Sequence, residues 1–187
     1  MGITPNPERP PRLPGDPVPE AEIEAMIRVD HAGEYGAVRI YDGQLAVIGR
    51  GHARDEIRRM AEHEKRHLAA FDELVRARQV RPTLLHPLWH VAGYALGAAS
   101  ALLGERAAMA CTVAVEEVID EHYRGQAERL GDSDPALSET IEAFRAEELA
   151  HRATALEHGA EEALGYELIS AVVKTGSLLA IWLSTRL

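Results

Sequence analysis

Two segments of the chain carry a glutamate and a histidine at the same spacing. The stretch "MAEHEKRHLAAF" places Glu64 three residues before His67. The stretch "FRAEELAHRATA" repeats the arrangement with Glu148 and His151. In a helix, side chains three positions apart point in similar directions, about 60° apart around the axis. The glutamate and the histidine of each pair can contact the same group only if their segment is helical. This requirement constrains the fold more than any other feature of the sequence.

Glycine and proline divide the chain into helical segments. They interrupt it at Gly49–Gly51, Pro82, Gly104, Gly131 and Gly159. The predicted helices cover about 20–48, 53–80, the stretch after His86-Pro87 as far as Leu103, 105–130, 135–158, and 161 to near the C-terminus. Ser133 or Asp134 is suited to cap the fifth helix ahead of Pro135. Because no alternating run is long enough for a sheet, the predicted fold class is all-α.

Composition limits the domain organisation and the partners. The first nineteen residues hold seven of the ten prolines, so residues 1–19 are predicted to form a disordered tail before one domain over 20–187. This tail has no apolar segment of the kind found in secretory signals, so we expect synthesis in the cytosol. The net charge of −10 argues against nucleic acid as a partner. The single cysteine, Cys111, fits a reducing compartment and is expected to be a small apolar core residue.

The repeated pairs fall at matching depths of two predicted hairpins. Glu34 and Glu64 lie roughly 24 and 21 Å from the turn near residue 50. Glu116 and Glu148 lie roughly 25 and 22 Å from the turn near residue 133. Each hairpin therefore brings one glutamate and one Glu-x-x-His to the same level near mid-helix, as expected for an internal repeat.

Four carboxylates and two imidazoles at one level form a ligand set for two iron or manganese ions, as in ferritin-like di-iron bundles. Glu116 follows the apolar run "AMACTVAV", where a carboxylate is costly to bury without a cation. The competing interpretation is that both Glu-x-x-His pairs are ordinary surface residues, since two such pairs alone carry little weight. The matched depths favour a dinuclear site whose ligands are Glu34, Glu64, His67, Glu116, Glu148 and His151.

Longer stretches of the sequence resemble a known family. "IRVDHAGEYGAVRIYDGQLAV", "EHEKRHL", "MACTVAVEEVIDEHY", "FRAEELAHRATALEHGAE" and "AIWLSTRL" are similar to the demethoxyubiquinone hydroxylases of coenzyme Q biosynthesis, in order, from about residue 23 to the C-terminus. The resemblance implies a ferritin-like bundle of two hairpins plus two apolar helices. It also implies two iron ions that are bridged by Glu64 and Glu148, with Glu34 and Glu116 each binding one ion.

The resemblance implies a monooxygenation of a lipid-tailed quinone. The ring of demethoxyubiquinone gains a hydroxyl from O2, and the second oxygen atom leaves as water. NADH is the implied electron donor, and other ubiquinone-biosynthesis proteins are possible partners. Because no strand followed by G-x-G-x-x-G occurs, we expect no Rossmann unit. Either NADH docks by a shallow contact near the metals, or the reductant is a different molecule.

Two apolar segments bear on how the protein reaches such a substrate. Residues 84–103 carry no charge, but only about 24 Å of helix follows Pro87, less than the roughly 30 Å hydrocarbon core. The sixth helix contains a second apolar stretch, "LISAVVKTGSLLAIWL", which Lys174 and Gly176 interrupt. Either both helices pack in the core, or both form a monotopic membrane face with Trp89, Tyr94 and Trp182 at the interface. The second interpretation predicts a peripheral protein on the cytoplasmic face of a bacterial inner membrane, or the equivalent mitochondrial face.

Further residues are weaker candidates. Tyr123 lies seven residues after Glu116 and so on the same helix face, where it could handle substrate or electrons or simply pack. Asp30 and Asp120, one turn from Glu34 and Glu116, could orient the ligand histidines through their second nitrogens, or each could be exposed or cap a helix. The histidines without a partner at ligand spacing are expected to be structural or exposed: His31, His52, His63, His86, His90, His122 and His158.

Two other classes of function share some of these features. A ferritin-like protein that oxidises iron or removes peroxide would use the same six ligands but has no need for the uncharged run at 84–103. A metal-free helical scaffold that binds a partner would need neither Glu-x-x-His pair.

Overall fold

The computed structural model describes residues 18–187, and within this range it contains helices and no strand. The elements are α1 Glu20–Val47, α2 His52–Ala77, α3 His86–Leu102, α4 Glu105–Leu130, α5 Pro135–Glu157, the short 3₁₀ helix η1 Ala160–Glu162, and α6 Tyr166–Ser184. The all-α prediction is confirmed. Asp134 caps α5, because its Oδ1 accepts a hydrogen bond from the Leu137 backbone N–H at 3.1 Å.

The predicted tail falls almost wholly outside the described residues. Of the segment 1–19, only Val18 and Pro19 are described. Val18 is buried, and its backbone N–H donates to Ser133 Oγ at 2.9 Å. This residue therefore belongs to the folded domain.

Two helix boundaries differ from those predicted. Helix α2 ends at Ala77, and not near Val80, because Gln79 adopts a left-handed φ of 55°. The Val80 N–H then bonds back to the Val75 carbonyl at 3.0 Å, which closes the helix with a Schellman motif. Helix α6 begins at Tyr166, and not near residue 161, because η1 and the left-handed Gly165 (φ 77°) redirect the chain first.

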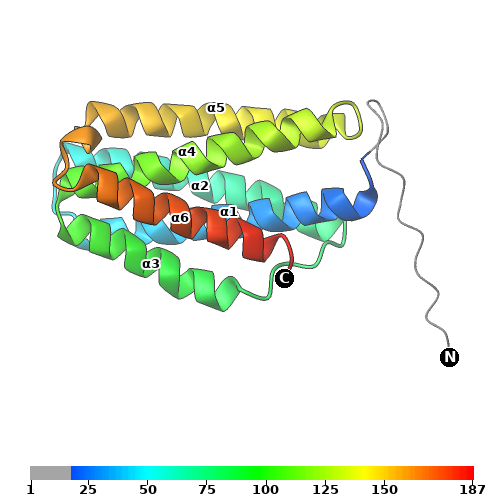
Figure 1. The fold of residues 1–187 in the computed structure, drawn as a ribbon, viewed down its shortest axis with the longest axis horizontal. Helices are drawn as coiled ribbons and strands as arrows, with labels where there is room; N and C mark the ends of the chain where they lie inside the picture. The colour runs from blue at the N-terminus through cyan, green and yellow to red at the C-terminus, as the bar shows by residue number, and fades with distance from the viewer. Residues whose placement is uncertain (1–17) are drawn as a thin grey trace.

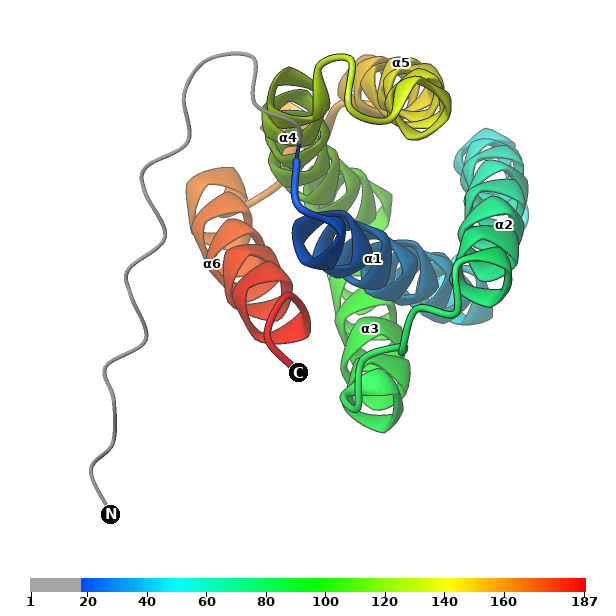
Figure 2. The ribbon, with the colours of Figure 1, turned by 90° about the vertical axis from the view of Figure 1, so that its right-hand side faces the viewer.

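The helices form two antiparallel hairpins, α1 with α2 and α4 with α5, and the two remaining helices pack beside them (Figure 1). Helix α3 packs mainly on α1, and α6 packs mainly on α4. The end-on view in Figure 2 places α3 and α6 on the side of the bundle away from α5. Cys111 of α4 is fully buried, and burial raises the pKa of its thiol to about 12, as suits a small core residue.

Close packing of α3 on α1 depends on glycine. A Cβ added at Gly97 would overlap the Ile40 carbonyl, and one at Gly43 would overlap the Tyr94 carbonyl. The two helix backbones therefore approach more closely than any side chain would permit. Only a narrow stripe of α3 is buried, which consists of Gly93, Gly97, Ser100 and Ala101.

The apolar side chains of α3 and α6 mostly face outward, which excludes the interpretation of both as core helices. On and beside α3, the exposed residues are Leu84, Leu88, Val91, Tyr94, Leu102 and Leu103. On α6 they are Leu168, Val172, Leu178, Leu179 and Trp182. By length and composition, α6 is the one helix among residues 18–187 that could cross a membrane, and 17% of its apolar window is buried.

Candidate metal centre

The structure brings all six predicted ligands together inside the bundle. Their exposed fractions lie between 0% and 3%. They form two overlapping groups, each with one ligand atom per residue within 4.8 Å of the others. The first group is Glu34, Glu64, His67 and Glu148, and the second is Glu64, Glu116, Glu148 and His151. Glu64 and Glu148 belong to both groups, so these two carboxylates lie between the two positions.

Each hairpin supplies half of the centre. Helix α1 carries Glu34 and α2 carries the pair of Glu64 and His67. Helices α4 and α5 supply the equivalent residues at the same depth. The residues around Glu116 explain the burial, because every side chain from Ala107 to Val115 is buried. A carboxylate on this segment of α4 has no route to solvent.

Six buried polar atoms of the centre lack hydrogen-bond partners. These atoms are Glu34 Oε2, both carboxylate oxygens of Glu64, His67 Nδ1, Glu116 Oε2 and Glu148 Oε1. His67 Nδ1 approaches Glu148 Oε1 at 3.1 Å and Glu34 Oε2 at 3.4 Å, but without hydrogen-bond geometry. Unpaired buried carboxylates are costly. Metal cations at the two positions would satisfy these atoms, so the residues fit a dinuclear centre of oxygen and nitrogen ligands.

The electrostatics of the metal-free centre point the same way. Burial, and then repulsion from Glu148, raises the pKa of Glu64 and of Glu116 well above the usual range. Burial opposes protonation of His67, but the carboxylates of Glu148 and Glu34 beside its ring outweigh it and raise the pKa of this imidazole to about 11. The carboxylates therefore hold protons or attract cations, and they do not coexist as free charges.

A tyrosine from each hairpin bonds to a glutamate of the other. Tyr123 Oη of α4 donates to Glu34 Oε1 of α1, which places this predicted residue at the centre. Tyr41 Oη of α1 donates to Glu116 Oε1 of α4 at 2.8 Å. Tyr41 was not predicted from the sequence. The spacing could have identified it, because Tyr41 follows Glu34 by seven residues, as Tyr123 follows Glu116.

The residues that contact the outer nitrogens of the two histidines differ from those predicted. His67 Nε2 lies 3.3 Å from Glu147 Oε2, and His151 Nε2 lies 3.1 Å from His63 Nδ1. His63 and Glu147 also contact each other at 3.2 Å. Each directly precedes a ligand glutamate, so they are equivalent positions of the repeat.

The prediction that Asp30 and Asp120 orient the ligand histidines is wrong. Asp30 Oδ1 accepts from Gln126 Nε2 at 2.8 Å and lies 3.1 Å from His122 Nε2. Asp120 accepts from Arg145 Nε at 2.6 Å. Both aspartates lie on the correct helices, but the rotation of those helices directs them to other partners.

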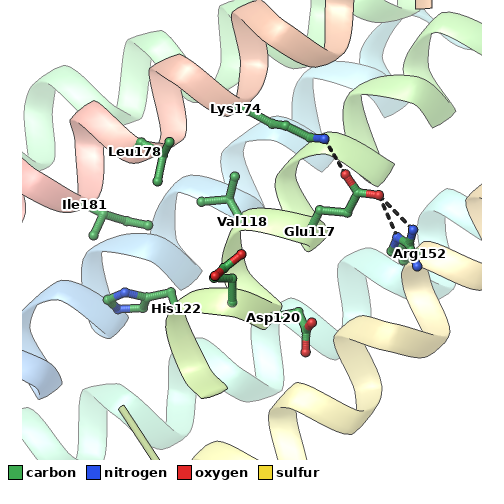
Figure 3. Close-up of a pocket in the computed structure, with 9 residues that line it drawn as sticks. Glu117, Val118, Asp120, His122, Arg152, Lys174, Leu178 and Ile181 are labelled. Carbon is green, nitrogen blue, oxygen red and sulfur yellow. Dashed lines mark hydrogen bonds and ion pairs between the residues drawn. The ribbon is translucent and has the colours of Figure 1, made fainter. Parts of the chain in front are cut away.

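A separate cavity of about 780 Å³ lies between α4, α5 and α6, and none of the six predicted ligands lines it. Glu117 spans one side of it, with Lys174 of α6 at 2.5 Å and Arg152 of α5 at 2.8 Å (Figure 3). Leu178 and Ile181 of α6 provide an apolar wall. Through Glu117, the ion pairs connect α4 to both α5 and α6.

Comparison with known proteins identifies close relatives. The family model "Ubiquinone biosynthesis protein COQ7" matches residues 21–184. A 3-demethoxyubiquinol 3-hydroxylase of Rhodospirillum rubrum is 57% identical over 176 residues, covering 94% of this chain and 83% of the relative. The NADPH-dependent 3-demethoxyubiquinone 3-hydroxylase, mitochondrial, of Homo sapiens is 49% identical over 176 residues, covering 92% and 81%. The 5-demethoxyubiquinone hydroxylase, mitochondrial, of Saccharomyces cerevisiae is 39% identical over 184 residues, covering 89% and 79%.

Proposed function

This chain belongs to the COQ7 family of ubiquinone biosynthesis proteins, and we propose that it is a di-iron hydroxylase of the demethoxyubiquinone ring. The observation that carries this proposal is the pair of overlapping ligand groups that share Glu64 and Glu148. In the proposed reaction, one atom of O2 enters the ring as a hydroxyl. The other atom leaves as water, and this requires two electrons and two protons.

The residues of this chain would hold two iron ions, one in each ligand group. When bound, the iron ions supply oxygen activation, which no amino-acid side chain provides. Glu64 and Glu148 hold carboxylate oxygens toward both positions, whereas Glu34 and Glu116 each serve one. Burial of all six side chains excludes bulk water from the reaction.

The neighbouring side chains fix these ligands. The Tyr123 phenol donates to one carboxylate oxygen of Glu34, and the Tyr41 phenol donates to one of Glu116. The second oxygen of each glutamate has no hydrogen-bond partner and is available to a metal ion. Glu147, through its contact with His67 Nε2, sets the orientation of an imidazole whose Nδ1 faces the carboxylates. For Tyr123 we propose, beyond this packing role, a part in handling substrate or electrons, supported by its contact with Glu34.

We assign the electrons to a nicotinamide nucleotide, and to NADH as the resemblance implies. The names of the Mus musculus and Homo sapiens relatives contain "NADPH-dependent", which supports the class of donor. Residues 18–187 contain no strand, so the donor docks on a helical surface. Turnover with equal concentrations of each nucleotide tests the assignment, because faster turnover with NADPH would overturn NADH as the preferred donor.

The quinone is proposed to arrive from a membrane through the exposed apolar sides of α3 and α6. Trp89 Nε1 donates to Ser184 Oγ at 3.0 Å, which joins the start of α3 to the end of α6. The two helices can therefore act as one surface. An apolar surface of this kind lies in the interface of one leaflet and gives a lipid-tailed substrate a route to the bundle.

Helix α6 is proposed to lie in the membrane plane and not to cross the bilayer. Lys174 in its middle pairs with Glu117 of α4, and Ser170 and Val173 are buried against the bundle. A spanning α6 would have to break this ion pair and expose the charge to lipid. We place the protein peripherally on the cytoplasmic face of a bacterial inner membrane or the equivalent mitochondrial face, among other ubiquinone-biosynthesis proteins.

The alternative of an iron-oxidising or peroxide-removing protein receives no support. The relatives are named as hydroxylases, and such a protein has no use for the outward apolar sides of α3 and α6. A metal-free scaffold would not bury six ligand-type residues at one level.

The test is product formation with labelled oxygen. Protein produced with iron should hold about two irons per chain and transfer one ¹⁸O atom from ¹⁸O2 to demethoxyubiquinone. Glu64→Ala and His151→Ala should lose most of the iron and the activity. Glu142→Gln changes an exposed glutamate of α5 and should retain both. Full iron occupancy in the double variant Glu64→Ala/His151→Ala, or ¹⁸O found only in water, would sink the proposal.

A further inference from the structure

A second group of potential metal ligands lies at one end of the bundle. His52 is the first residue of α2, Glu56 follows one turn later, and His158 is the C-cap residue of α5. One ligand atom from each lies within 4.8 Å of the others. His52 Nδ1 is 3.4 Å from Glu56 Oε1, and the centroids of the two imidazole rings are 5.0 Å apart. Residues far apart in sequence thus meet where α1 turns into α2 and α5 runs into η1 (Figure 1).

We propose that His52, Glu56 and His158 form an additional site for a divalent transition metal of the zinc class, separate from the di-iron centre. Two imidazoles and one carboxylate favour Zn²⁺, Ni²⁺ or Cu²⁺ over Mg²⁺ or Ca²⁺, which prefer oxygen ligands throughout. The His52 side chain is 76% exposed, so the remaining coordination positions are open to water. Along α2, His52 and Glu56 lie roughly 18 and 12 Å from Glu64.

The surroundings of the site favour a cation. The Glu56 side chain is only 10% exposed, so its position is fixed by packing, and it already attracts a cation, because Arg59 contacts its Oε1. The Arg59 side chain is 67% exposed and can rotate into solvent when a metal replaces it. The α5 C-terminus presents its negative dipole end at His158, whereas the α2 N-terminus presents a positive end at His52. Because the two helix dipoles oppose each other at the site, the affinity for a metal ion depends on the three ligands.

A metal at this site would join the two hairpins. Polar contacts connect α2 to α5 along their length: Arg78 to Asp134 at one end and His63 to Glu147 near the middle. The proposed site is the corresponding connection at the opposite end. Because only the folded chain brings the three ligands together, metal binding should stabilise the native state.

The experiment uses iron-loaded, full-length protein dialysed against Zn²⁺, with zinc and iron counted per chain. The wild type should take up one zinc while its iron content stays constant, and its melting temperature should rise. His52→Ala and His158→Ala should each bind zinc at least about tenfold more weakly, since even loss of an indirect metal contact commonly costs that much. His90→Ala removes a histidine outside the site and should bind zinc as the wild type does.

Arg59→Ala separates the proposal from a folding artefact. Removal of the competing guanidinium should strengthen zinc binding, and a misfolded variant would not show that gain. Equal zinc uptake by the wild type, His52→Ala and His158→Ala would overturn the proposal. So would zinc that appears only as iron is lost, or no zinc uptake by either wild type or Arg59→Ala.

Discussion

Tyr41 of α1 and Glu116 of α4 are joined by a hydrogen bond of 2.8 Å across the interior of the bundle. Tyr123 of α4 returns an equivalent bond to Glu34 of α1. This reciprocal exchange follows the internal repeat, because each tyrosine lies seven residues after the glutamate of its own helix. It links the two hairpins directly at the candidate metal centre.

Tyr41→Phe should destabilise the metal-free protein by roughly 1–3 kcal/mol, since Glu116 would lose the phenol that donates to its Oε1 and would remain buried. Denaturant unfolding monitored by circular dichroism measures this loss. Tyr35→Phe is the matched control, because its hydroxyl contacts His90 in an exposed position. An equal loss of stability in both variants would contradict the importance of the buried bond.

Iron removal should lower the melting temperature, and the melting temperature of the metal-free protein should depend on pH. The folded-state pKa values of Glu34, Glu64 and Glu116 are raised, first by burial. Such carboxyls bind protons more tightly in the folded state than in the unfolded chain, so the stability they contribute is lost as pH rises above about 4.5. The pKa of His67 is raised from 6.5 to about 11, so the stability that this imidazole contributes is also lost as pH rises above about 6.5.

Between pH 5 and 8, the metal-free protein should therefore melt at progressively lower temperature as pH increases. Glu148 is the exception, because its hydrogen bond with His151 and the adjacent imidazole of His67 overcome the effect of burial and lower its pKa to about 2. Its contribution changes only at pH values below this window. Calorimetry at fixed ionic strength tests the trend, and a metal-free melting temperature that rises through this range would contradict it.

Gly97→Ala should destabilise the protein by several kcal/mol, because the new Cβ would collide with the Ile40 backbone and push α3 from α1. Gly125→Ala provides the opposite case. Nothing lies within 4 Å of a Cβ there, so higher helix propensity should stabilise α4 by up to about 1 kcal/mol. Chemical denaturation measures the free energy of unfolding of both variants. A stability change of the same sign in both would contradict the prediction.

Leu88→Glu together with Val91→Glu should release the protein from liposomes, because both side chains are more than half exposed on α3. Wild-type binding should depend little on salt, since apolar burial drives it despite the net charge of −10. Iron content should stay unchanged, and a short-tailed quinone should still be hydroxylated. Flotation of the double variant with the vesicles, or loss of its iron, would contradict the proposed membrane surface.

The sequence alone determined the helices and the six ligand candidates. Helical geometry fixes which residues share a face and how far each lies from a turn. The Glu-x-x-His spacing and the matched depths therefore predicted one level of the bundle without tertiary information. The seven-residue spacing places Tyr123 on the same helix face as Glu116. The same spacing, applied to α1, would have placed Tyr41 on the face of Glu34.

Only the tertiary structure decided what depends on how the helices are rotated and packed. Asp30 and Asp120 have suitable spacing, yet helix packing directs them away from the ligand histidines and gives those contacts to His63 and Glu147. The meeting of His52 with His158 likewise depends on the contact between α2 and α5. Apolar composition did not distinguish a core helix from a lipid-facing one, because both kinds of helix are rich in the same apolar side chains. Only the packing of α3 on α1 and of α6 on α4 shows that most of each helix is exposed.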